Sequence, residues 1–136
     1  MGGGTSKASV ASTDFKSYTT QAEGKASVTT TDLKSFIQSE VQENQVVIWS
    51  KTWCGYCSRT KALFERPEFK DVNVKVHELD QMSNGFAIQS LLAVITGQRT
   101  VPSVWVGGKF IGGSDDTFAA YRTGRLQSML GFSSKL

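Results

Sequence analysis

Hydrophobic and polar residues alternate along the chain in a way that predicts successive helices and strands from residue 31 onward. Asp32 is expected to cap the first helix, and apolar residues at helical spacing follow it: Leu33, Phe36, Ile37 and Val41. Residues 45–50 form a short, mostly β-branched apolar run, which is typical of a buried central strand. A second helix is expected over residues 55–66, because a proline follows it.

The second half of the chain continues this alternation. Apolar and polar residues alternate over 74–79, which predicts a second strand, and a helix is expected over 86–96. The predicted strands 103–106 and 109–111 flank a Gly-Gly pair, the signature of a tight hairpin. Ser114 is expected to cap a further helix. This order of elements predicts an α/β fold, a four-stranded mixed sheet flanked by helices, which is the arrangement of the thioredoxin fold.

The N-terminal segment differs in composition from the rest. Residues 1–30 are rich in Ser, Thr, Gly and Ala, so we expect a disordered tail in front of a domain of residues 31–136. The first six residues, MGGGTS, match the pattern for N-myristoylation of Gly2, although a flexible start can match it by chance. One acyl chain binds membranes only weakly, so acylation would give partial membrane association. A transit peptide is less favoured, because the segment has no Arg and carries two acidic residues.

Composition narrows the function classes. The net charge is +3 and the basic residues are scattered, so we expect no nucleic-acid binding. No apolar run is long enough to cross a bilayer. The two cysteines are too few for the disulfide framework of a secreted protein, and they lie three positions apart. They therefore indicate redox chemistry in a reducing compartment, and we expect a cytoplasmic protein.

The cysteines lie where a predicted strand passes into a predicted helix. Cys54 is expected at the helix N-terminus, where backbone N–H groups favour a thiolate, and Lys51 adds positive charge. Cys57 is one turn further on the same face, close enough to form a disulfide with Cys54. Cys54 is thus the expected nucleophile and Cys57 the resolving thiol. Half of a zinc site is less favoured, because only His77 remains as a nitrogen ligand, and two inert core cysteines are the other alternative.

Three motifs occur in order along the chain: KTWCGYC at 51–57, TVP at 100–102 and GGSD at 112–115. Together they resemble the signatures of the dithiol glutaredoxins, and the resemblance covers residues 32–130. It implies a glutathione-dependent thiol–disulfide oxidoreductase that reduces protein disulfides and glutathionylated proteins.

The resemblance also implies a glutathione site. Pro102 is expected to be cis and to face the cysteines, leaving the backbone of Val101 to pair with the peptide part of glutathione. The N–H groups of Ser114 and Asp115 suit the γ-glutamyl carboxylate, and the Asp115 side chain suits the amine, although helix capping alone would also explain these two residues. On the family pattern Lys51 and Gln89 bind the glycyl carboxylate, and Tyr56 lines the groove.

Gly55 departs from the commonest glutaredoxin site, which has Pro at this position. The Trp-Cys-Gly-x-Cys pattern also resembles thioredoxins and disulfide isomerases, so a thioredoxin-like protein disulfide reductase is one alternative. The other is a binding protein, because glutaredoxins with Gly or Ser at this position are known to hold a [2Fe–2S] cluster across a dimer. In that dimer Cys54 of each chain and two glutathiones would be the ligands; otherwise we expect a monomer.

Overall fold

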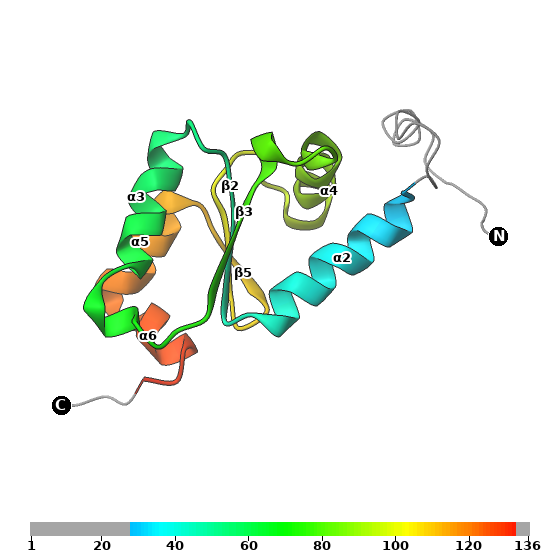
Figure 1. Ribbon diagram of the computed structural model, residues 1–136. Coiled ribbons are helices and arrows are strands. Elements are labelled where there is room, and N and C mark those ends of the chain that lie inside the picture. Colours follow the sequence, from blue (N-terminus) through cyan, green and yellow to red (C-terminus); the bar gives the residue numbers. More distant parts are fainter. Residues whose placement is uncertain (1–27, 133–136) are drawn as a thin grey trace.

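The computed structural model describes residues 28–132, which form one four-stranded sheet with helices on both faces (Figure 1). The predicted α/β arrangement of the thioredoxin fold is therefore confirmed. Residues 1–27, which include the myristoylation motif and most of the predicted tail, lie outside the described residues. No helix within 28–132 has both the length and the apolar character needed to span a membrane.

The strand order in the sheet is β3-β2-β4-β5. The strands are β2 (Val46–Ser50), β3 (Val74–Glu78), β4 (Ser103–Val106) and β5 (Lys109–Gly112). β2 runs parallel to β3 and antiparallel to β4, which pairs antiparallel with β5. Every residue of β2 is buried, as expected for a central strand. The prediction that β3 extends to Leu79 is wrong, because that residue starts a 3₁₀ turn, η2 (Leu79–Gln81), where the chain leaves the sheet.

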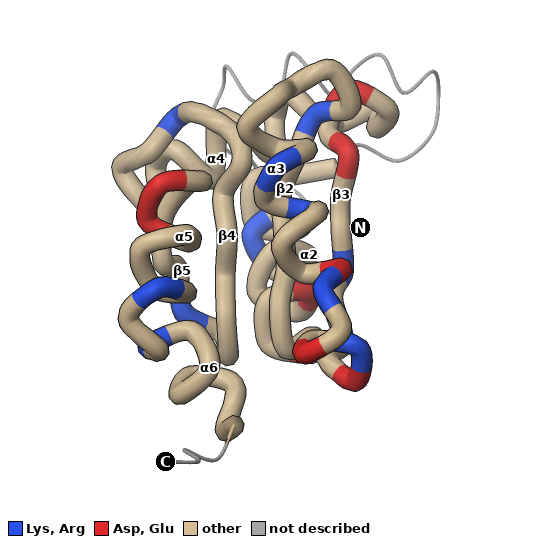
Figure 2. The backbone as a smooth tube through the Cα atoms, turned by 90° about the vertical axis from the view of Figure 1, so that its left-hand side faces the viewer, with Lys and Arg blue, Asp and Glu red and all other residues tan. Residues whose placement is uncertain are grey.

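The helices cover the two faces of the sheet. They are α2 (Thr30–Glu43), α3 (Gly55–Phe64), α4 (Gly85–Thr96), α5 (Ser114–Thr123) and α6 (Arg125–Met129), with a 3₁₀ turn, η1 (Pro67–Phe69), after α3. α2 and α4 lie on one face, whereas α3, α5 and α6 lie on the other (Figure 1). Figure 2 views the second face and shows acidic and basic positions dispersed over the molecule rather than gathered in one patch.

The start of α2 corrects one prediction. Thr29, not Asp32, is the N-cap: its Oγ1 accepts a hydrogen bond from the backbone N–H of Asp32 at 3.0 Å. The Asp32 carboxylate in turn accepts from the backbone N–H of Thr29 at 3.1 Å. This reciprocal pair moves the start of the helix to Thr30, inside the segment assigned to the tail, because the aspartate works from the third helical position.

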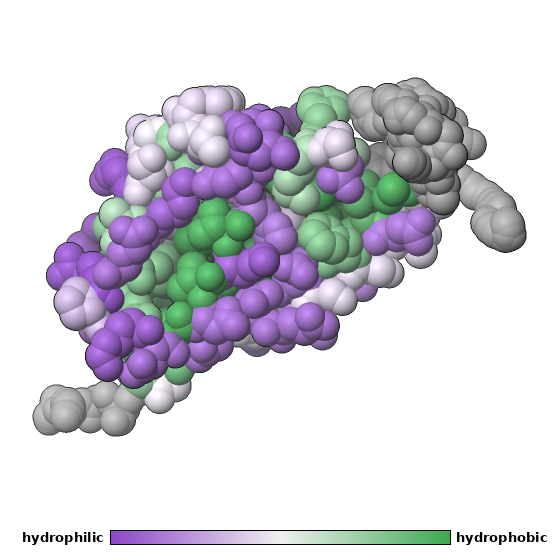
Figure 3. Space-filling model, in the orientation of Figure 1, coloured by the Kyte–Doolittle hydropathy of each residue, from purple (hydrophilic) through white to green (hydrophobic). Residues whose placement is uncertain are grey.

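Each face of the sheet has its own hydrophobic core. On the α2 and α4 side the ring of Trp49 stacks on His77 at a centroid distance of 4.4 Å, and His77 Nε2 lies 2.8 Å from Glu40 Oε1. His77 therefore links α2 to the sheet. The core on the α3 and α5 side includes Ile48 and Phe69. On the face shown in Figure 3, hydrophobic surface forms limited areas bordered by polar side chains.

Candidate active site

Cys54 and Cys57 lie where β2 passes into α3, as the sequence predicts. Cys54 is the N-cap residue of α3, and its Sγ accepts a hydrogen bond from the backbone N–H of Cys57 at 3.3 Å. Both are free thiols; Cys54 is partly exposed and Cys57 is fully buried. The helix start therefore directs a backbone donor at the accessible sulfur, which is how a helix N-terminus stabilises a thiolate.

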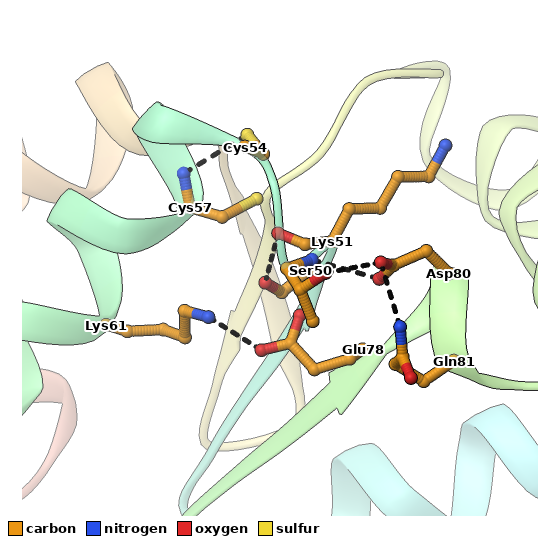
Figure 4. A network of polar contacts seen from close by, with 9 residues as sticks. Ser50, Lys51, Cys54, Cys57, Lys61, Glu78, Asp80 and Gln81 are labelled. Carbon is orange, nitrogen blue, oxygen red and sulfur yellow. Dashed lines mark hydrogen bonds and ion pairs between the residues drawn. The ribbon is translucent and has the colours of Figure 1, made fainter.

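Cys57 has a different environment. Burial, together with its contact with the Cys54 side chain, raises the pKa of Cys57 to about 11, although Lys51 and Ser50 act in the opposite direction through hydrogen bonds. Ser50 is buried at the end of β2, and Figure 4 shows it between the cysteines and an ion pair of Lys61 with Glu78 (2.6 Å). At neutral pH Cys57 is thus a protonated thiol, which suits a residue that reacts second.

The loop between β2 and α3 is held by an aspartate that belongs to none of the three motifs. Both the backbone N–H (2.9 Å) and the hydroxyl of Thr52 donate to the Asp80 carboxylate in η2. These two bonds lower the pKa of Asp80 to about 2, so the carboxylate is ionised across the physiological range. Two residues before Cys54, the chain is therefore fixed to a neighbouring segment.

The loop before β4 approaches Cys54. The Val101–Pro102 peptide bond is cis, as expected, and Pro102 is buried. The carbonyl oxygen of Val101 lies 3.9 Å from Cys54 Sγ. Cys54 and Val101, which are 47 positions apart in sequence, are thus neighbours in space, and the part of Val101 that faces Cys54 is its backbone.

Two glycines bring the start of α5 to this loop. Gly112 has a φ of +124°, and a Cβ there would collide with the Asp116 carboxylate, so only glycine fits. At Gly113 a Cβ would lie 3.5 Å from the carbonyl oxygen of Pro102. The GGSD motif and the TVP motif are therefore neighbours in space.

The predicted cap of α5 is corrected in the same turn. Gly113 is the N-cap residue, and Ser114 is the first residue of the helix, because the Asp116 carboxylate accepts from the Gly113 N–H (3.3 Å) and so caps the turn. The buried Ser114 hydroxyl has no hydrogen-bond partner among residues 28–132. Asp115 is exposed in the first turn of the helix. Backbone donors, a buried hydroxyl and an accessible carboxylate thus share one helix end, which suits an anionic group with an amine beside it.

The other predicted ligands of glutathione are placed as follows. Lys51 Nζ lies 5.4 Å from the centre of the Trp53 ring, and in Figure 4 its side chain extends away from the two sulfur atoms. Gln89, in α4, donates through Nε2 to the carbonyl of Arg99 at 2.9 Å. Part of its hydrogen-bonding capacity is therefore used within the protein. Tyr56 is 58% exposed beside Cys54.

Among the described residues, no group of three or more His, Cys, Asp and Glu side chains could hold a metal ion. His77 contacts Trp49 on the α2 side of the sheet, whereas Cys57 belongs to α3 on the opposite side. The zinc alternative therefore has no support in the described part of the chain.

A second missed residue is Gln98, in the loop that leads to Val101. Its side-chain amide donates to the carbonyls of Thr100 and Pro102. No spacing rule singles it out, because its partners are backbone atoms of a loop without regular structure. Only its position between the end of α4 and the TVP motif could have drawn attention to it.

Comparisons with known proteins agree with this geometry. The glutaredoxin family model matches residues 46–111. Glutaredoxin-C8 of Oryza sativa subsp. japonica is 47% identical over 100 residues, covering 74% of this chain and 73% of the relative. Glutaredoxin-C4 of Arabidopsis thaliana is 43% identical over 98 residues, covering 72% and 70%.

Solved structures give the same result. A buckwheat glutaredoxin–glutathione complex has a TM-score of 0.66 at 47% identity, covering 73% of this chain and 90% of that one. The holo form of glutaredoxin C1 from Populus tremula x tremuloides has a TM-score of 0.65 at 40% identity, covering 73% and 94%. A cysteine pair at a helix start, a cis-proline loop beside it and relatives of this similarity lead to one conclusion: the chain belongs to the glutaredoxin family.

Proposed function

We propose that Cys54 is the nucleophile of a glutathione-dependent thiol–disulfide exchange and that Cys57 is the resolving thiol. The reaction class follows from family membership, which makes the protein a glutathione-dependent oxidoreductase. One observation carries the assignment of roles: Cys54 is partly exposed and accepts a backbone hydrogen bond at the start of α3, whereas Cys57 is fully buried.

The reaction starts when the Cys54 thiolate attacks the glutathione sulfur of a glutathionylated protein. A bond forms between Cys54 and glutathione, the original disulfide breaks, and the protein thiolate leaves and takes a proton from water. A free glutathione thiolate then releases oxidised glutathione and restores Cys54. With a protein disulfide, Cys54 first joins the substrate; Cys57 then attacks Cys54 Sγ, and two glutathiones reduce the resulting Cys54–Cys57 disulfide.

For glutathione itself we propose a groove between the TVP loop and the start of α5. The backbone of Val101 would pair with the cysteinyl part, which brings the ligand sulfur toward Cys54, 3.9 Å from the Val101 carbonyl. Ser114 and Asp115 would bind the γ-glutamyl end. Lys51 would bind the glycyl carboxylate. Gln89 would add the hydrogen-bonding capacity of its side-chain amide that the bond to Arg99 does not use. The glutathione complex of the buckwheat relative supports this proposal.

The test is a glutathione-coupled assay on a glutathionylated peptide. Cys54→Ser should abolish turnover, whereas Cys57→Ser, the matched control, should keep much of it, because glutathione can resolve the mixed disulfide at Cys54. Equal loss in both variants would contradict the assignment. The thioredoxin-like alternative is not favoured by the family comparisons; it would require turnover with thioredoxin reductase and none with glutathione.

Three finer expectations remain predictions: a cytoplasmic location, acylation of Gly2 and a cluster-bridged dimer. Gly2 lies outside the described residues.

A further inference from the structure

The side-chain amide of Gln98 connects two backbone carbonyls on either side of Val101. Nε2 donates to Thr100 O at 3.0 Å and to Pro102 O at 3.1 Å, so both of its hydrogens are used. The Val101 carbonyl between them is the one that lies 3.9 Å from Cys54 Sγ. One side chain therefore holds the two carbonyls that flank Val101.

Gln98 is itself anchored to the end of α4. Its backbone N–H donates to Thr96 Oγ1 at 3.0 Å, and that hydroxyl donates to Leu92 O at 2.8 Å in the last turn of the helix. Gly97, between them, ends the helix in the left-handed conformation. The amide is thus held from a rigid element and reaches out to the loop.

A second glutamine completes the pattern. Gln89, from the same helix, donates to Arg99 O at 2.9 Å, so glutamine amides satisfy the carbonyls of residues 99, 100 and 102. In the described part of the chain, no residue accepts a hydrogen bond from the N–H of Val101. These bonds replace the ladder that a strand would supply and leave the backbone of Val101 available to a ligand.

Gln98 also borders the other half of the groove. Its side-chain amide lies 3.7 Å from the position that a Cβ would take on Gly113, the N-cap residue of α5. The Gln98 side chain therefore binds the loop around Val101 and lies next to the turn that presents Ser114, the two segments that the proposed glutathione site needs.

We propose that Gln98 is a positioning residue for glutathione, which fixes the Val101 backbone against the start of α5 so that the groove is formed before the ligand arrives. This inference rests on the proposed function. Without the amide, the loop would have to be ordered when glutathione binds, which weakens binding. The chemistry of Cys54 would be unaffected, because its helix and the Asp80–Thr52 contact belong to other elements.

The test compares Gln98→Met, which keeps length and neutrality but cannot donate, with Gln127→Met. Gln127, in α6, is a matched control. Its Nε2 also donates to a backbone carbonyl, that of Tyr121 in α5 (3.3 Å). For a glutathionylated peptide we expect Gln98→Met to raise KM about five- to thirtyfold, equivalent to one or two lost hydrogen bonds, with kcat little changed. The direct reaction of reduced enzyme with 2-hydroxyethyl disulfide should keep its rate, and Gln127→Met should leave all three constants at the parent values.

Hydrogen exchange in peptides covering residues 99–103 gives a second readout. It should be faster in Gln98→Met than in the parent and should slow again when glutathione is added. A parental KM in Gln98→Met would overturn the inference, as would equal slowing of both reactions, which would indicate general damage. If Gln98→Met does not fold, the same measurements on Gln98→Ala decide between these outcomes. A parent enzyme without glutathione-dependent turnover would instead overturn the proposed function.

Discussion

At the scale of single residues, the two cysteines are made unlike by a difference of one helical turn. Cys54 lies at the helix start and accepts a backbone hydrogen bond from the residue three positions on. Cys57 lies one turn inside, beneath the surface, where no water can solvate a thiolate. The same three-residue spacing that allows a disulfide therefore separates an accessible sulfur from a buried thiol that keeps its proton.

The pKa of Cys57 provides the first test at this scale. In a Cys54→Ser variant, thiolate absorbance in the ultraviolet should report Cys57 alone. Burial is the largest cause of the shift to about 11, so the midpoint should stay above the ordinary value of 9.0 even without the Cys54 contact. A midpoint at or below that ordinary value would contradict the structure.

The same shift has a consequence for stability. A thiol whose pKa is raised on folding stabilises the protein fully below its unfolded value of 9.0, and this contribution is lost as the pH rises toward 11. The difference in unfolding free energy between the parent and Cys57→Ser should therefore shrink across that interval. Denaturant titrations at several pH values would measure it, and a constant difference would contradict the shift.

At the scale of elements, the start of α3 has room for a larger residue than Gly55. Gly55 is the first helical residue, and a Cβ there would meet nothing within 4 Å. The preceding Cys54 is extended, with φ −90° and ψ 121°, which is the conformation favoured before proline. The proline that most glutaredoxins have at this position would therefore fit without rearrangement.

Gly55→Pro should raise the free energy of unfolding by about 0.4–1 kcal/mol, because it restricts the unfolded chain at a position already compatible with proline. Gly124→Pro is the matched control. A Cβ at Gly124 also has open space, but φ there is +83° and its N–H donates to Tyr121 O, so this change should be destabilising. Denaturant midpoints of the two variants give the comparison; a destabilised Gly55→Pro would contradict the local geometry.

Elements were easier to predict from the sequence than the contacts between them. β2 and the hairpin of β4 and β5 follow from local patterns, and Gly107 and Gly108 do have positive φ values of 60° and 81°. The predicted helix caps lie three residues (α2) and one residue (α5) after the observed caps, because Asp32 and Asp116 act from the third helical position. A Thr or Gly three residues ahead of such an acid is the signal that could have corrected them.

The candidate site was predictable as far as the motifs reach. Cys54 was expected from the spacing of the two cysteines, and Val101 and Ser114 from the resemblance; the fold places their segments side by side. Asp80 and Gln98 were missed because each acts on the backbone of a loop. Such partners depend on how elements pack, and no spacing in the sequence encodes that.

At the scale of the whole molecule, the two faces of the sheet contribute differently to the site. The core against α2 and α4 contains Trp49, on which His77 stacks, whereas the cysteines lie at the start of α3 on the other face. The site itself lies where chain ends of several elements meet: the end of β2, the starts of α3 and α5, and the loop before β4 (Figures 1 and 4). Within residues 28–132, one chain offers a single accessible thiol.

A cluster-bridged dimer is the prediction that belongs to this scale. Iron in a [2Fe–2S] cluster needs four thiolates; two chains would supply two Cys54 side chains, and two glutathiones would supply the rest. Anaerobic reconstitution with iron, sulfide and glutathione should give a coloured dimer in the parent and in Cys57→Ser, but not in Cys54→Ser. A colourless monomer from the parent, or a cluster that survives Cys54→Ser, would exclude it. Gly55→Pro serves as a further comparison, because its ring adds bulk and stiffness beside Cys54.

The burial of Cys57 also sets up a competition in time. Once glutathione is attached to Cys54, the mixed disulfide can be resolved in two ways: by a glutathione molecule from solution or by the Cys57 thiol one turn away. Burial raises the pKa of Cys57, so most Cys57 thiols keep their proton at pH 7 and attack by Cys57 is slowed, although it needs no collision with a second molecule. The rate of resolution by glutathione rises in proportion to the concentration of free glutathione, whereas the rate of resolution by Cys57 does not. There is therefore a crossover concentration, above which the protein works as though it had one cysteine and below which the second takes over.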